Sequence, residues 1–149
     1  MKIIKKIILA VLVMFTFVAC ASTVNLTGSA APIKVAQKKV LVAEYTKAHG
    51  LWAHEIDTVF RVKGWKVSHI KYWEVDNLDY SKRDETFLIV INKMYSVEQG
   101  MFNDFLYEGN IEVFDLRTGK KIINYNANKE RKFNIILGLS NALGGLVEK

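Results

Sequence analysis

The first twenty residues constrain this chain most, because they decide how much of it remains to fold. Lys2, Lys5 and Lys6 precede an apolar run over Ile7–Val18, and small residues then surround Cys20, the only cysteine. Positive charge, an apolar run and small residues in this order are typical of an export signal. The apolar run has about a dozen residues, fewer than the roughly 20 that cross a bilayer core as a helix. The pattern therefore predicts a removable signal and not a permanent anchor.

The residues around the cysteine allow two cleavage sites. Ala19-Cys20-Ala21 fits the A-x-A site at which an ordinary secreted protein is cut. Phe17-Val18-Ala19-Cys20 resembles the lipobox of bacterial membrane lipoproteins, in which the cysteine thiol is lipidated and becomes the new N-terminus. A lone thiol in an exported protein needs an explanation, and lipidation supplies one. We expect lipidation at Cys20.

The lipoprotein resemblance also implies a location. Cysteines modified in this way carry two or three acyl chains, which hold a protein on the membrane far more firmly than a single chain does. In Gram-negative lipoproteins, Asp directly after the cysteine retains the protein in the inner membrane, whereas this chain has Ala21. The resemblance therefore implies a cell-envelope protein attached to the membrane through its N-terminal lipid. In a Gram-negative host it would lie at the outer membrane and face the periplasm.

The composition of the mature chain fits a single domain. The formal net charge of +6 includes Lys2, Lys5 and Lys6, and without them 18 basic and 15 acidic residues give +3. This value is ordinary for a soluble domain, and export argues against a nucleic-acid partner. With the only cysteine committed to lipid, no disulfide can form, and stability must come from packing. We divide the chain into a signal peptide (1–19), a lipidated cysteine with a small, polar, flexible linker (20–35) and one α/β domain (36–149).

Apolar periodicity over the domain predicts five strands and two helices. The strands are expected at Lys38–Tyr45, Trp65–Val75, Thr86–Val97, Phe105–Asp115 and Lys121–Ala127, and the helices at Thr46–Lys63 and Phe133–Val147. Asp115–Lys120 is expected to be a hairpin turn in which Gly119 takes a positive φ. The order β-α-β-β-β-β-α predicts an α+β fold with a mixed, mostly antiparallel sheet of about five strands and the helices on one face.

This element order, with the Asp-x-x-Thr-Gly-Lys turn at Asp115–Lys120 and a closing helix, resembles the small α/β domains of uncharacterised envelope lipoproteins. It is less closely similar to the amino-terminal domain of the Tol-system propeller protein and to the curli-secretion lipoprotein. The resemblance covers the topology of most of the mature chain but no functional residues. It therefore implies a fold and not a function.

The residues that could carry chemistry do not form a recognisable site. His49 and His54 lie five residues apart, whereas a zinc-protease helix needs histidines four apart, and Thr58 occupies the place of the second ligand. His69 is expected to be a hydrogen-bonded histidine at the edge of the core. The cysteine is used by the lipid, no serine lies in a G-x-S-x-G setting and no glycine-rich loop could hold a phosphate. We predict no metal site, no cofactor and no enzymatic activity.

One loop could make a contact with a partner. Met101 and Phe102 lie in the break over Gly100–Asp104, and Phe105 follows it. Exposed apolar loops mark partner or membrane contacts. We therefore predict a membrane-anchored module for protein interaction or structure, with an envelope protein as partner, that pairs through this loop or through a sheet edge. The alternative is a lipid-anchored protein that binds a small molecule, lipid or cell-wall fragment on a sheet face bearing Trp65 and Trp73.

Overall fold

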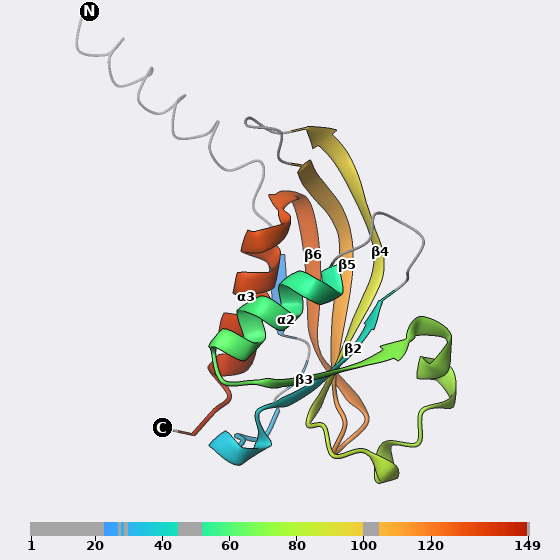
Figure 1. Ribbon diagram of the computed structural model, residues 1–149, viewed down its shortest axis with the longest axis vertical. Helices are drawn as coiled ribbons and strands as arrows, with labels where there is room; N and C mark the ends of the chain where they lie inside the picture. Colours follow the sequence, from blue (N-terminus) through green and yellow to red (C-terminus); the bar gives the residue numbers. More distant parts are fainter. Residues whose placement is uncertain (1–22, 27, 29, 45–51, 100–104, 149) are drawn as a thin grey trace, which may run out of the picture.

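The computed structural model describes residues 23–26, 28, 30–44, 52–99 and 105–148. Six strands form one sheet in the order β1-β6-β5-β4-β2-β3, and two helices pack on it (Figure 1). The strands are β1 Thr23–Leu26, β2 Lys39–Glu44, β3 Lys66–Lys71, β4 Phe87–Gln99, β5 Phe105–Asp115 and β6 Lys120–Arg131. The helices are α2 Trp52–Val62 and α3 Lys132–Gly144, and three short 3-10 helices are η1 Val35–Gln37, η2 Tyr72–Asn77 and η3 Tyr80–Lys82.

The topology confirms the predicted α+β class. Strand β2 pairs in parallel with both β3 and β4, so β2-α2-β3 is a crossover unit. Strands β4, β5 and β6 pair antiparallel in succession, and the Asp115–Lys120 turn joins the last two. Gly119 has a φ of 67°, as the turn requires. The sheet is therefore mixed and mostly antiparallel.

The main core lies between the sheet and the two helices. From α2 it takes Trp52, Ile56 and Phe60, and from α3 it takes Ile135, Ile136, Leu139 and Leu143. These side chains recur at helical spacing, which places them on one face of each helix. They pack on strand residues that alternate along β2, β4 and β5, namely Val40, Val42, Phe87, Ile89, Ile91, Ile111 and Val113. The helices thus cover the same face of the sheet.

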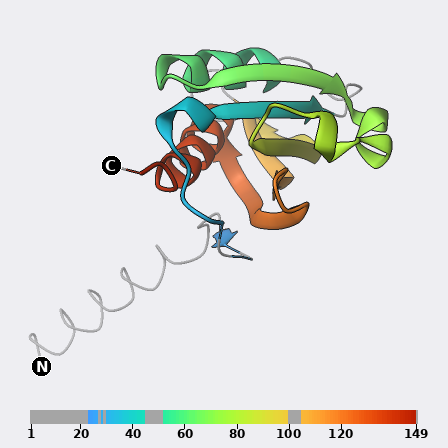
Figure 2. The same cartoon turned by 90° about the horizontal axis from the view of Figure 1, so that it is seen from below.

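The opposite face of the sheet is divided in two. Over β2 and β4, a smaller core of Leu41, Leu88 and Val90 is covered by the segment from η2 onward, which lies across the sheet from α3 (Figure 2). Over β5 and β6, the same face is polar. There Asn92 Nδ2 donates to Asn110 Oδ1 at 3.0 Å, and Asn110 Nδ2 donates to Asn126 Oδ1 at 2.9 Å.

The strand predicted at Trp65–Val75 is wrong in its second half. Strand β3 ends at Lys71, opposite Glu44, the last residue of its parallel partner β2. Beyond that point no described residue of β2 remains to pair with β3, and the chain turns into η2, with Lys71 N donating to Glu74 Oε2. Trp65 is consequently buried in the main core, whereas Trp73 is 63% exposed on η2. The expected sheet face bearing both tryptophans does not form.

The segment before β2 packs on the domain instead of leading away from it. Strand β1 pairs antiparallel with β6. Ile33 is fully buried, with its N–H donating to Leu146 O at 2.9 Å and its carbonyl accepting from Glu148 N at 2.8 Å. The described part of the 20–35 segment therefore differs from the flexible linker that its small, polar composition predicted.

The antiparallel strands extend beyond the rest of the sheet. Strand β4 has 13 residues and β2 only 6, and β6 continues to Arg131, beyond Ala127, where the predicted strand ended. In Figure 1, β4, β5 and β6 accordingly rise past the end of β2. We call this part, residues 94–99, 105–108 and 128–131 with Phe133 beside it, the sheet tip.

Within the described part of the chain, neither helix is long and apolar enough to span a membrane.

Candidate interaction surface

A bulge and a glycine begin the sheet tip. The register of β4 shifts between Ile91 and Met94, and Met94 then pairs with Gly109 of β5. A Cβ atom on Gly109 would lie 2.0 Å from the carbonyl oxygen of Lys93, so only glycine allows this approach. Bulges bend a strand and increase its twist. The sheet tip begins at this bulge.

Large apolar side chains are exposed at the sheet tip. Phe105 at the start of β5 is 51% exposed, and Phe133 in the first turn of α3 is 57% exposed. Tyr95 and Val97 of β4 are exposed as well. Tyr95 follows Met94, which belongs to the helix-side core, so the side chain of Tyr95 faces the opposite side. The tip therefore presents apolar groups on both faces of the sheet.

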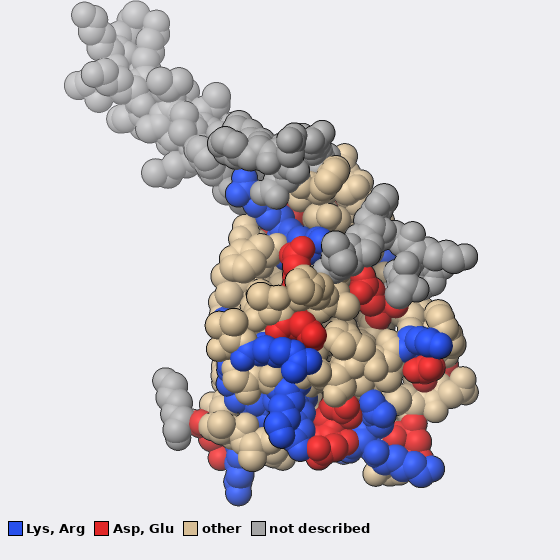
Figure 3. Space-filling view, viewed as in Figure 1, with Lys and Arg blue, Asp and Glu red and all other residues tan. Residues whose placement is uncertain are grey.

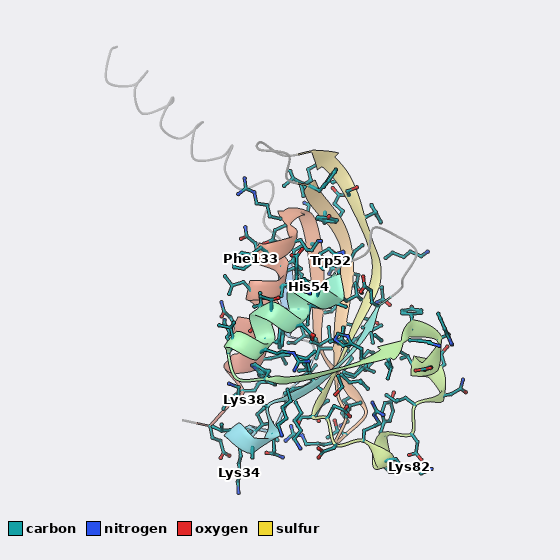
Figure 4. All side chains as sticks on the ribbon, in the orientation of Figure 1. Lys34, Lys38, Trp52, His54, Lys82 and Phe133 are labelled. Atoms are coloured by element: carbon teal, nitrogen blue, oxygen red, sulfur yellow. The ribbon has the colours of Figure 1, made fainter. Side chains whose placement is uncertain are left out.

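Phe105 and Phe133 line one depression of about 320 Å³ between β5 and α3, together with Glu55, Tyr107, Arg131, Lys132 and Asn134. Its floor is well fixed. Lys132 Nζ lies 2.9 Å from Glu55 Oε1 and above the rings of Trp52 and Tyr107, which meet edge-on with their centroids 5.1 Å apart. Figure 4 shows Phe133 at the start of α3, near Trp52. The exposed phenyl groups thus sit on a rigid support.

A second cavity lies where β4 passes the start of α2. It measures about 210 Å³ and is lined by Glu44, Trp52, Ile91, Asn92, Lys93, Met94 and Tyr95. The indole N–H of Trp52 is buried and has no hydrogen-bond partner among the described residues. Pockets for drug-sized ligands usually measure about 300–1,000 Å³. This cavity is therefore small for a ligand site.

The sequence-predicted site residues fall largely outside the described ranges. Cys20, Met101 and Phe102 all lie there, so that lipidation and the loop contact stay predictions. Phe105 is described and lies half-exposed at the sheet tip. Tyr95, Val97 and Phe133 join it in space, although the sequence analysis assigned them to a strand and a helix and singled out none of them.

The structure describes two of the three histidines. His69 Nε2 lies 2.9 Å from Asp57 Oδ1, so the predicted hydrogen bond forms, but the side chain is exposed and does not lie at the edge of the core. His54 is exposed on α2, and His49 lies outside the described residues. No group of three or more metal-ligating side chains comes together in the described ranges.

Side chains occupy part of the free edge of β3. Arg61 Nη2 donates to the carbonyl oxygen of Val67 at 2.9 Å, and Glu74 accepts the N–H of Lys71 at 3.2 Å. Edge strands covered in this way are less able to pair with another chain. The β3 edge of the sheet is therefore partly blocked as a site for pairing with another chain.

Comparison with known proteins identifies the fold only. No family model matches the chain, and no curated protein matches its sequence. Among solved structures, a PelC dodecamer from Paraburkholderia phytofirmans matches with a TM-score of 0.54 and 13% identity, over 87% of this chain and 100% of that one. A dodecamer of a point variant of the same PelC matches with a TM-score of 0.53 and 14% identity, over 83% and 98% of the two chains. The chain thus has a PelC-like fold.

Proposed function

We propose that this protein is a lipid-anchored lipoprotein of the cell envelope that assembles with further copies of itself and serves a structural or protein-interaction role without catalysis. The observation that carries the proposal is the extent of the structural match, which covers nearly all of both chains. The matched proteins are dodecamers, so a domain of this shape can form a closed homo-oligomer. The predicted lipid at Cys20 supplies the envelope location, at the outer membrane if the host is Gram-negative.

The exposed apolar surface supports a role in contact with a partner or with the membrane. Phe105 and Phe133 line an open depression and are held by a rigid floor, as described above. Monomeric soluble proteins seldom expose such groups together without a functional reason. Met101 and Phe102 belong to the same proposal, because they precede Phe105 in the chain.

A ligand-binding role has less support. It would require a face bearing Trp65 and Trp73, but Trp65 is buried and Trp73 lies on η2. The cavity beside Trp52 measures only about 210 Å³, and the hollow of about 420 Å³ that Trp73 lines includes no second tryptophan. We therefore favour assembly, and a small molecule or glycan that copurifies with the protein would reverse this preference.

The anchor is tested by expressing the full chain and the Cys20→Ser variant in a bacterial host. The membrane fractions are separated, and the N-terminal peptide is analysed by mass spectrometry. We expect the parent chain in the membrane fraction with an acylated N-terminal Cys20, and the variant in the soluble fraction. An unmodified thiol at Cys20 on a soluble protein would contradict the anchor.

A further inference from the structure

We propose that the sheet tip docks on the surface of the membrane that carries the anchor, with Phe105, Phe133, Tyr95 and Val97 among the lipid headgroups. The inference rests on the proposed function in one respect, since it takes Cys20 as the point of lipid attachment. It adds a second, non-covalent contact with lipid, made by the folded domain. The occupant of the apolar surface is thus a bilayer and not a protein.

The direction of β1 places the anchor at this end of the molecule. Thr23 pairs with Asn126 and Leu26 with Ile123, so the chain traced back from Thr23 heads along β6 toward Arg131. Arg131 lies five residues beyond Asn126, which corresponds to about 17 Å of strand. Cys20 precedes Thr23 by three residues, a reach of at most about 11 Å. A lipid on Cys20 therefore lies within about 11 Å of Thr23, whose partner Asn126 pairs with Asn110 just before the sheet tip begins.

The chemistry of the tip fits an interface between water and lipid. Tyr and Trp concentrate at the headgroup level of membranes, because each joins an apolar ring to a polar group, and Phe is among the residues that supply the apolar face of interfacial elements. The tip exposes Tyr95 and Phe105, each 51%, and Phe133. These groups lie on both faces of the sheet, as is required if the end of the sheet inserts among the headgroups. A flat contact with one partner surface would use a single side.

Cations surround the apolar groups. Lys93, Lys129 and Arg131 are exposed at or beside the tip. Lys and Arg near an anionic membrane surface each contribute about 1 kcal/mol of attraction. Among the carboxylates of this region, Glu108 and Glu130 are half-buried, Glu130 accepts a hydrogen bond from the Tyr125 hydroxyl at 2.9 Å, and Glu55 is ion-paired with Lys132.

The opposite end has a different surface. On the face that Figure 3 shows, many acidic and basic side chains gather toward the end away from the tip. Lys34, Lys38 and Lys82 lie at that far end in Figure 4. Exposed apolar residues also occur outside the tip, but Val62 and Trp73 come from two separate elements, α2 and η2. They provide matched controls.

Fluorescent labelling of the full lipidated chain tests the proposal. The natural sequence has no cysteine besides Cys20, whose thiol the lipid would occupy, so that an introduced cysteine is the only free thiol. Phe105→Cys and Val97→Cys are labelled with an environment-sensitive dye, with Trp73→Cys and Val62→Cys as controls. Each protein is reconstituted into vesicles of phosphatidylethanolamine and phosphatidylglycerol with and without nitroxide-labelled lipid. We expect a blue-shifted emission and its loss to the nitroxide at positions 105 and 97, and neither effect in the controls.

Three other results would overturn the docking. Dye in water at positions 105 and 97, on protein that sediments with the vesicles, leaves the anchor intact and refutes the docking alone. A blue shift without nitroxide quenching means that another protein copy covers the tip. A chain that fails to join the vesicles and carries a free thiol at Cys20 refutes the anchor, and with it the docking.

Discussion

At the scale of single residues, one ion pair closes the last hairpin and secures the N-terminal segment. Arg117 Nε and Nη2 donate to the two carboxylate oxygens of Asp115 at 2.9 and 2.7 Å, and Asp115 is 1% exposed. Hydrogen bonding to this carboxylate raises the pKa of Arg117 above its ordinary value. Nη2 also donates to the carbonyl oxygen of Ala31 at 2.9 Å. The pair therefore joins the turn to the chain that enters the domain.

Replacement of Arg117 by Ala should lower the free energy of unfolding by about 3 kcal/mol, because it leaves a buried carboxylate without its partner. Equilibrium unfolding in urea measures the change. The control is Lys82→Ala, which removes an exposed ion pair with Asp79 and should cost less than about 1 kcal/mol. Equal losses in the two variants would show that the Asp115 pair has no special weight.

The polar face of the sheet provides a prediction of pH dependence. A hydrogen bond from Lys121, at 2.7 Å, lowers the pKa of Glu112 below its usual value of 4.5, and Asn92 adds to the effect. A lowered folded-state pKa stabilises the fold at pH values above 4.5. This contribution disappears as the pH falls through the folded-state pKa.

The Glu112→Gln variant should therefore be less stable than the parent chain at neutral pH, by about 0.5–1 kcal/mol for a partly exposed pair. The difference should shrink as the pH falls below 4.5, the usual pKa of the group. Urea unfolding of both proteins at several pH values measures it. A difference that stays constant into the acid range would exclude the ion pair as its cause.

At the scale of elements, the sequence predicted those that carry their own periodicity. Strand β5 has the predicted bounds, and α3 begins one residue early, because their apolar patterns are local. Ile33 is a single apolar residue after a proline, and its burial depends on its backbone pairing near the far C-terminus. Similarly, β3 is short because its pairing partner β2 is short, and Tyr95 is exposed because β4 extends beyond the end of β2. Such features depend on partners that one segment does not encode.

The N-terminal segment offers the sharpest test at this scale. Ile33→Ala should lower the free energy of unfolding by about 2–4 kcal/mol, because Ile33 is fully buried in the main core. Val35→Ala, two residues on and 68% exposed, should change stability by less than about 0.5 kcal/mol. If both variants unfold like the parent chain, residues 30–35 form a tether after all and do not belong to the domain.

At the scale of the whole molecule, the fold separates two ends. The chain traced back along β1 heads toward the apolar sheet tip, so the proposed lipid at Cys20 would lie toward that end, and charged side chains gather toward the opposite end (Figure 3). Copies anchored in one membrane would share an orientation, which suits a closed assembly about an axis normal to the membrane. The sequence alone indicated the anchor and the loop after β4, but not this common orientation.

The mass of the native complex tests the proposed self-assembly most directly. The full chain is purified from membranes in mild detergent, and native mass spectrometry gives both the mass of the complex and the modification of its subunit. We expect one dominant species that contains several copies of an acylated chain beginning at Cys20. The same measurement on the Met101→Ser/Phe102→Ser double variant shows whether these two residues contribute to the assembly. The proposed assembly would be contradicted if the monomer is the dominant species at a protein concentration equal to that in the membrane.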